Sequence, residues 1–181
     1  LRVVDVIETD GRGLNLTAEV RDGILQHKSS GHPATLEGVA VSLADRIAYI
    51  NHDIEDAIRA GILKDSDLPK NAVEVLGHAT RERINTVITD IYLRSAGTDG
   101  VHMSENVADA MNELRSFMFR NIYSLTNKSM QDRAERMLTA MYGYFLRYPE
   151  RLPEQYLALA ENAPKEQIVC DYLSGMTDRY A

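Results

Sequence analysis

The chain has 181 residues, of which 44% are hydrophobic and 26% are charged, and this composition excludes a largely disordered protein. Its length fits a single folded domain, since domains usually run to about 100–200 residues. The 27 acidic and 20 basic residues give a formal net charge of −7. That charge disfavours nucleic acid and anionic membrane surfaces as partners.

Several features favour a cytoplasmic protein. No stretch approaches the about 18 consecutive apolar residues of a membrane span, and no charged-then-apolar leader is present. The single cysteine, Cys170, cannot form an internal disulfide, and its place after Ile168 and Val169 predicts a packed thiol. The chain opens at Leu1 in residues typical of mid-helix, without a capping residue before them. We interpret this opening as a truncated start.

The apolar residues recur at steps of three and four, and no segment alternates long enough to predict a strand, so we expect an all-α fold. Caps and chain breakers set the helix limits, with Thr17, Thr35, Asp67 and Ser104 as the predicted first caps. The expected helices run to about residue 8 and then span residues 17–27, 36–60, 67–76, 80–95, 104–125, 129–147, 153–161 and 164–173.

The helix expected over residues 36–60 has two contrasting faces. An arc of about 100° holds an apolar stripe for the core, made of Val39, Leu43, Ile47, Ile50, Ile54 and Ile58. The opposite arc holds Asp45, Tyr49, His52, Asp53 and Asp56. One interpretation is the solvated face of an amphipathic helix. The other is a binding face, because uncompensated acids repel one another along a helix, and carboxylates beside a tyrosine suit a divalent cation with a sugar or base.

A second pattern lies in the helix expected over residues 104–125. Its predicted core stripe consists of Val107, Met111, Leu114, Met118, Ile122 and Leu125. Along its flank, Arg115, Phe119 and Tyr123 follow one another at steps of four. A guanidinium in such a row can hold phosphate and the tyrosine can pack on a sugar. The alternative is a surface arginine beside aromatic residues at the edge of the core.

Residues 43–56, LADRIAYINHDIED, resemble the last motif of the HD-domain deoxynucleoside triphosphate triphosphohydrolases. Segments 14–27 (LNLTAEVRDGILQH), 111–123 (MNELRSFMFRNIY) and 171–181 (DYLSGMTDRYA) are similar to the same family, so the resemblance covers the whole chain. It implies the C-terminal part of a helical HD-superfamily domain with additional C-terminal helices. Residues 1–60 would end the HD core and residues 61–181 would complete the nucleotide pocket, within a single helical unit.

The resemblance also implies an activity, a cofactor and a partner. Members of the family cleave a deoxynucleoside triphosphate (dNTP) to the deoxynucleoside and inorganic triphosphate. The implied cofactor is a divalent metal ion, which is Mg, Mn or a transition metal, and the implied assembly is a homo-oligomer. We therefore expect a dNTP triphosphohydrolase whose partners are the dNTP substrate and further copies of the protein, with no nucleic acid and no membrane.

Site residues carry over from the resemblance motif by motif. Asp45 would be a metal ligand and Arg46 would contact phosphate. Tyr49 would line the sugar pocket, and Asp53 would accept a hydrogen bond from the sugar 3′-hydroxyl. On the helix expected over residues 104–125, Arg115 would hold phosphate and Tyr123 would pack against the deoxyribose.

The family's metal set is His, His-Asp and Asp, and only the final Asp is found here, as Asp45. The other ligands and the catalytic residues are expected upstream of Leu1, so we expect the chain alone to be inactive. His27 either approaches the site or, like most lone histidines at helix ends, is structural. The alternative function is a non-catalytic helical module that binds nucleotide or serves in interaction and regulation.

Overall fold

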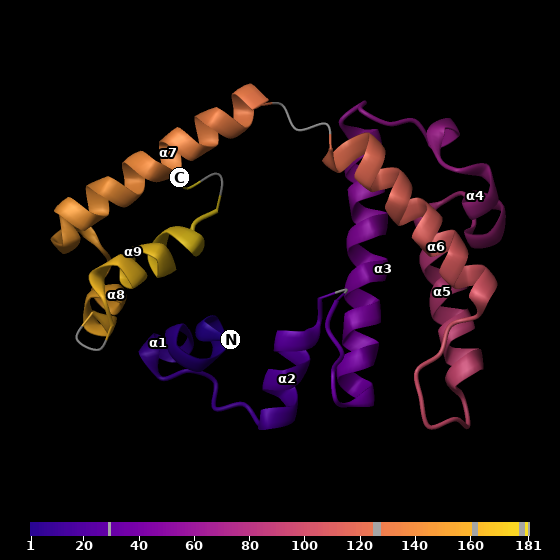
Figure 1. The fold of residues 1–181 in the computed structure, drawn as a ribbon, viewed down its shortest axis with the longest axis horizontal. Helices are drawn as coiled ribbons and strands as arrows, with labels where there is room; N and C mark the ends of the chain where they lie inside the picture. The colour runs from indigo at the N-terminus through magenta and orange to yellow at the C-terminus, as the bar shows by residue number, and fades with distance from the viewer. Residues whose placement is uncertain (29, 125–127, 161–162, 178–179, 181) are drawn as a thin grey trace. The chain divides into compact units, whose positions relative to one another are not determined.

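The computed structural model describes residues 1–28, 30–124, 128–160, 163–177 and 180. These residues form helices and connecting turns without a strand, which confirms the all-α class (Figure 1). The α-helices are α1 (Glu8–Gly11), α2 (Ala18–Gln26), α3 (Leu36–Arg59), α4 (Lys70–Leu76), α5 (Thr80–Ser95), α6 (Glu105–Met118), α7 (Lys128–Arg147), α8 (Glu154–Leu159) and α9 (Lys165–Ser174). Shorter π-helical turns are η1 (Val3–Ile7) and η3 (Phe119–Tyr123), and 3-10 turns are η2 (Asp65–Asp67) and η4 (Pro149–Arg151). No described helix is long and apolar enough to cross a membrane.

The contacts divide the chain into two compact units. The central unit is Thr17–Leu125, and the terminal unit is Leu1–Leu16 with Thr126–Ala181. The single helical unit expected from the sequence stays a prediction.

Two of the predicted caps are confirmed, at the starts of α2 and α3. The Thr17 hydroxyl accepts a hydrogen bond from the backbone N–H of Val20 at 3.5 Å, and the Thr35 hydroxyl accepts one from Gly38 at 3.1 Å. Both contacts satisfy an N–H that has no partner within the helix. Beyond the end of α3, Gly61 has a φ of 71°, a left-handed conformation that glycine adopts at little cost.

The predicted start at Asp67 is wrong. Its carboxylate accepts from the backbone N–H of Lys64 at 2.9 Å, so it stabilises the turn η2, and Pro69 precedes the first residue of α4.

Ser104 does precede α6, but without a side-chain cap. The regular part of α6 ends at Met118, and the chain continues through η3 to Tyr123. The expected core residue Leu125 and the helix end at residue 161 lie outside the described residues.

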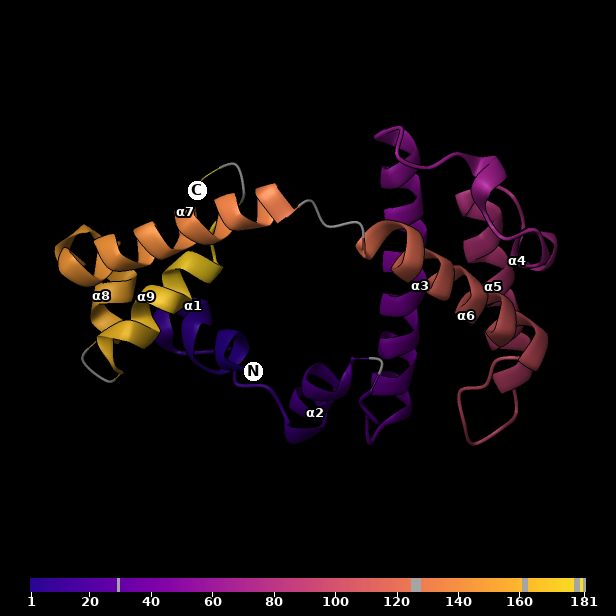
Figure 2. The same cartoon turned by 45° about the horizontal axis from the view of Figure 1, so that its top comes forward.

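The core of the central unit forms where α3, α4, α5 and α6 meet. Figures 1 and 2 show α6 crossing α3 obliquely, and α6 also packs on α4. From the predicted stripes, Ile47, Ile50, Ile54, Val107, Met111, Leu114 and Met118 are buried. The remaining described members, Val39, Leu43, Ile58 and Ile122, are partly buried. The core-facing sides of both helices were therefore predicted correctly.

A buried polar contact joins α5 to α3. Arg83 is 1% exposed and Asn51 is 0% exposed. The Arg83 guanidinium donates to Asn51 Oδ1 at 2.8 Å, to Thr80 Oγ1 at 3.0 Å and to the carbonyl oxygen of His78. The Asn51 amide in turn donates to the Ile47 carbonyl at 2.8 Å. Burial lowers the pKa of Arg83, and these hydrogen bonds offset part of the desolvation cost of its charge.

In the terminal unit, α7 and α9 pack side by side (Figure 2). Arg2 forms a two-pronged ion pair with Asp171 on α9, with Nε–Oδ1 and Nη2–Oδ2 distances of 2.7 and 2.5 Å. The hydrogen bond from Arg2 lowers the pKa of Asp171, with a smaller contribution from Gln167. Cys170 is exposed, which corrects the prediction of a packed thiol. The neighbouring Val169 faces the core, and one residue along a helix turns the side chain by about 100°.

Candidate functional site

The structure joins two of the predicted site residues that are far apart in sequence. The Tyr123 hydroxyl, on η3, donates a hydrogen bond to Oδ2 of Asp53 on α3, across 70 residues of sequence. Burial raises the pKa of Tyr123, and the hydrogen bond and negative charge of Asp53 raise it further. Tyr123 therefore stays protonated and serves as a donor, while the carboxylate of Asp53 serves as the acceptor.

Tyr49 belongs to the same end of the site. It is partly buried, it packs against the core of the central unit as Tyr123 does, and it contributes to the raised pKa of Tyr123. Phe119 lies edge-on to Tyr123, with the ring centroids 5.1 Å apart. Tyr123, the hydrogen-bond donor to Asp53, therefore has other aromatic rings close to it. Such an arrangement suits a sugar, because a ring face covers its apolar side and a carboxylate accepts from its hydroxyls.

Two arginines that the resemblance assigns to phosphate line one cleft between α3 and α6. The cleft has a volume of about 180 Å³, and Arg46 and Arg115 border it from opposite helices. The Arg46 Nε donates to the Ser42 carbonyl one turn earlier at 3.4 Å. The Arg115 guanidinium lies over the Phe119 ring, 5.2 Å from its centroid. Two arginines that border one cleft bring positive charge to it, which favours an anionic ligand.

The arginine cleft and the Asp53–Tyr123 pair lie one after the other along the lengths of α3 and α6. Arg46 precedes Asp53 by seven residues, which is about 10 Å along a helix at 1.5 Å per residue. One end therefore presents positive charge, and the other presents a carboxylate and aromatic rings. A ligand that carries phosphates at one end and a sugar at the other would match this order.

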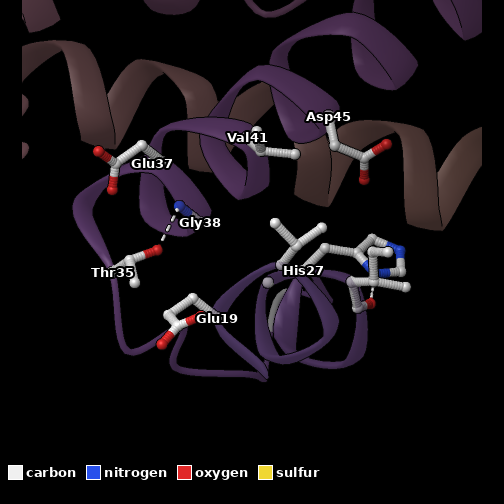
Figure 3. Close-up of a pocket in the computed structure, with 10 residues that line it drawn as sticks. Glu19, His27, Thr35, Glu37, Gly38, Val41 and Asp45 are labelled. Carbon is white, nitrogen blue, oxygen red and sulfur yellow. Dashed lines mark hydrogen bonds between the residues drawn. The ribbon is translucent and has the colours of Figure 1, made fainter. Parts of the chain in front are cut away.

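Asp45 lies on a different side of α3. It is exposed and borders a pocket of about 570 Å³ between α2 and α3 (Figure 3). In that view the Asp45 carboxylate and the His27 ring lie at one end of the pocket, and Thr35 and Glu37 lie at the other. The pocket also carries exposed Val20 and Val41. The structure therefore does not bring Asp45 into the arginine cleft.

His27 is held in a defined orientation at the end of α2. Its Nδ1 lies 2.6 Å from the Ile24 carbonyl oxygen, which can only accept, so Nδ1 is the donor in this hydrogen bond. The His27 carbonyl accepts from the Ser42 hydroxyl at 2.7 Å. Hence the histidine has a structural role at the helix end, and it also borders the pocket that Asp45 borders.

The fit of a metal ion to the described residues is partial. A divalent ion in a protein takes about four to eight ligands. Within the described ranges, no three His, Cys, Asp or Glu side chains converge to hold one. Asp45 is a carboxylate of the required type on the pocket edge, and His27 is a nitrogen donor there. These two residues could supply only part of a ligand set.

Sequence reasoning missed Asn112 as a member of the site. It borders the cleft together with Arg46 and Arg115. The signal was available, because Asn112 stands one turn before Arg115 and shares the flank of Arg115, Phe119 and Tyr123 on a helical projection.

Comparisons with known proteins agree with these motifs. Residues 101–181 match the phosphohydrolase-associated domain. A deoxyguanosinetriphosphate triphosphohydrolase-like protein of Caldanaerobacter subterraneus subsp. tengcongensis is 45% identical over 183 residues, covering 100% of this chain and 54% of the relative. Proteins of the same description from Clostridium tetani and Desulfatibacillum aliphaticivorans are 42% and 37% identical, with 99% and 100% of this chain covered and 55% and 57% of the relatives.

The chain thus spans about half the length of these relatives. The matching half is their C-terminal part. The resemblance read from the motifs is confirmed: over its whole length the chain is similar to the C-terminal part of the deoxyguanosinetriphosphate triphosphohydrolase-like proteins, a phosphohydrolase family.

Proposed function

We propose that this chain is the nucleotide-binding part of a metal-dependent phosphohydrolase that cleaves a dNTP to the deoxynucleoside and inorganic triphosphate. The observation that carries the proposal is the order of groups between α3 and α6. The Tyr123–Asp53 pair lies at one end, and the cleft bordered by Arg46 and Arg115 lies at the other. The names of the relatives, which describe triphosphohydrolase-like proteins, support the same reaction class.

The sugar end would recognise the 3′-hydroxyl. Asp53 uses one carboxylate oxygen to accept from Tyr123, and a carboxylate has lone pairs for further donors. The 3′-hydroxyl would donate to a remaining lone pair of the Asp53 carboxylate. The rings of Tyr49 and Tyr123 would pack against the deoxyribose, whose carbon skeleton is apolar.

The phosphate end would neutralise the triphosphate. The protein has a net charge of −7, which repels a polyanion at long range, so binding requires local positive charge. Arg46 and Arg115 supply it from two helices. As water bonds to the α-phosphorus and the bond from that phosphorus to the sugar 5′-oxygen breaks, guanidinium groups held in place would stabilise the added negative charge on the phosphate oxygens.

Asp45 would contribute one carboxylate oxygen to a divalent ion, with His27 as a neighbouring nitrogen donor. Such an ion, when bound, would polarise the α-phosphate and lower the pKa of a bound water. The chain's own part would be to hold the Asp45 carboxylate on α3, one turn before Tyr49. Removing the carboxylate by Asp45→Ala should abolish metal binding in the full-length protein, whereas exposed Asp56→Ala should not.

The test uses the protein at its full natural length. It is incubated with each dNTP and with Mg²⁺, Mn²⁺ or a transition metal, and ion-exchange chromatography separates the phosphates from one another and from the deoxynucleoside. Inorganic triphosphate and deoxynucleoside in equal amounts are expected. Pyrophosphate or single phosphates would contradict the assignment.

A second candidate is a non-catalytic helical module that binds nucleotide or serves in interaction and regulation. The observation in its favour is the partial metal-ligand set in the described part of the chain. This function predicts dNTP binding without turnover under every metal condition. Equilibrium dialysis with labelled dNTP, run beside the product assay, separates the two functions.

We also propose a homo-oligomer in the cytoplasm. Exposed apolar residues on α5 support an interface, since Ile88, Tyr92 and Leu93 are 54%, 70% and 66% exposed, and grouped exposed apolar side chains favour protein contacts. Sedimentation equilibrium tests the assembly. A monodisperse monomer at all concentrations would contradict it.

A further inference from the structure

Asn112 is the one neutral amide on the edge of the α3–α6 cleft among the described residues. It lies on α6, it is exposed, and it borders the cleft with Arg46 and Arg115. Another asparagine follows nine residues later, but the Asn121 amide donates to the Phe117 carbonyl at 2.9 Å. The two asparagines therefore have different surroundings.

The position of Asn112 extends the row of site residues by one turn. Asn112 and Arg115 lie one turn apart on α6 and both border the cleft, and Phe119 and Tyr123 follow on η3. Asn121 also lies on η3 and does not border the cleft. Along the axis, the row runs from Tyr123 at the sugar end to Arg115, and Asn112 lies about 4.5 Å beyond it. This order assigns Asn112 to the phosphate end, on the side away from the sugar.

The amide has the right chemistry for that place. Its Nδ2 carries two N–H donors, which a phosphate oxygen accepts. A lysine at this position would repel Arg115, because residues three apart on a helix are neighbours and like charges there are destabilising. Asparagine adds hydrogen-bond donors to the cleft without adding repulsion to the two arginines.

We propose that Asn112 donates a hydrogen bond through Nδ2 to the polyphosphate part of the nucleotide, as a third phosphate-binding group beside Arg46 and Arg115. The assignment rests on the proposed function for its substrate class. It does not depend on catalysis, because a phosphate-binding group should also hold inorganic triphosphate.

The test compares Asn112→Ala and Asn112→Asp with the matched variants Asn121→Ala and Asn121→Asp. Isothermal titration calorimetry with inorganic triphosphate gives the dissociation constant, and thermal melts followed by circular dichroism verify that each variant folds. Asn112→Asp should weaken binding by about tenfold or more, because it replaces a donor with a negative charge. Asn112→Ala should weaken it about three- to tenfold. Asn121→Asp adds the same charge at a position that does not border the cleft and should change binding by less than about twofold.

Steady-state kinetics on the full-length protein give the second readout. Asn112→Ala should raise the KM for dNTP and change kcat little, which is the signature of a binding contact made equally in ground and transition states. Equal binding constants for the Asn112 and Asn121 variants would overturn the proposal, and so would a wild-type protein that does not bind inorganic triphosphate. If Asn112→Asp loses triphosphate binding while the full-length protein hydrolyses no dNTP, the proposed reaction fails and the Asn112 contact stands.

Discussion

The hydroxyl of Tyr123 donates a hydrogen bond to the carboxylate of Asp53, which ties η3 to α3. Oδ2 of Asp53 accepts this hydrogen bond, and the carboxylate has lone pairs that can accept from another donor. In the proposed complex that donor is the 3′-hydroxyl of the sugar. The pair is therefore both a link within the fold and a part of the nucleotide site.

Asp53→Ala should lower kcat/KM for a dNTP by about tenfold or more, because the 3′-hydroxyl loses its charged acceptor. The 2′,3′-dideoxy analogue has no 3′-hydroxyl, so the same substitution should leave its kcat/KM nearly unchanged. Asp56→Ala, at an exposed acid one turn later on α3, is the matched control. An equal loss for both nucleotides would mean that Asp53 does not contact the 3′-hydroxyl.

Tyr123→Phe keeps the ring and removes the donor. We expect the free energy of unfolding to fall by about 0.5–1.5 kcal/mol, the usual net worth of one hydrogen bond, measured by urea denaturation. Tyr92 is 70% exposed on α5, and Tyr92→Phe should leave stability within about 0.5 kcal/mol of wild type. If the two variants are equally stable, the hydrogen bond to Asp53 is not maintained in solution.

Arg115→Lys should weaken nucleotide binding about as much as Arg115→Gln, although lysine keeps the positive charge. Lysine keeps the positive charge but loses the planar fork that binds phosphate with two parallel hydrogen bonds, and it stacks less well over Phe119. Both Arg115→Lys and Arg115→Gln should raise the KM for dNTP about tenfold or more. Arg59 pairs with Asp56 at 3.0 Å on the exposed end of α3, so Arg59→Gln is the control. A near-normal KM for Arg115→Lys would show that charge alone suffices.

Substitution of Arg83 should lower the free energy of unfolding of the central unit more than most substitutions do. Arg83→Ala removes a 1%-exposed side chain and leaves the Asn51 amide oxygen without its donor. We expect a loss of about 2–4 kcal/mol from the cavity and the unsatisfied oxygen together. The exposed Arg81 on the same helix provides the control variant Arg81→Ala. Equal urea midpoints for the two variants would contradict the buried network.

The stability of the terminal unit should depend on acid pH through Asp171. The hydrogen bond from Arg2 lowers the pKa of Asp171 below its ordinary value of 3.8. A carboxylate with a lowered folded pKa stabilises the fold above its unfolded pKa, and this contribution is lost as the pH falls through the folded value. The protection factors of the α9 amides, which correct for intrinsic exchange rates, should therefore fall below about pH 4. Asp171→Asn should exchange faster at neutral pH and respond less to acid, whereas the exposed Glu166→Gln should behave as wild type.

Local patterns predicted much of the fold. Thr35 and the apolar spacing of Ile47, Ile50 and Ile54 located α3 and its buried side, because capping and helical periodicity act within a few residues. Arg83 could not be predicted as buried, because charged residues are mostly exposed and its acceptors include Asn51 on another helix. Asp67 failed as a helix cap because its carboxylate satisfies the neighbouring turn instead.

The motifs supply the residues of the candidate site, whose roles stay predictions, and only the structure shows which of them lie together. The motifs named Asp53 and Tyr123 separately, and their hydrogen bond depends on how α6 crosses α3, which no local pattern determines. Likewise, the cleft that brings Asn112 beside Arg46 exists only once two helices have packed. Asp45 was predicted on the same face as Tyr49, yet it borders the pocket with α2.

The most direct test is a crystal structure of the full-length protein with a dNTP analogue that resists hydrolysis at the α-phosphate. We predict that the sugar 3′-oxygen lies within hydrogen-bond distance of Asp53, and that the phosphates lie between Arg46 and Arg115. A nucleotide bound elsewhere, for example in the apolar groove that Ile88 and Tyr92 line between α3 and α5, would contradict the proposed site.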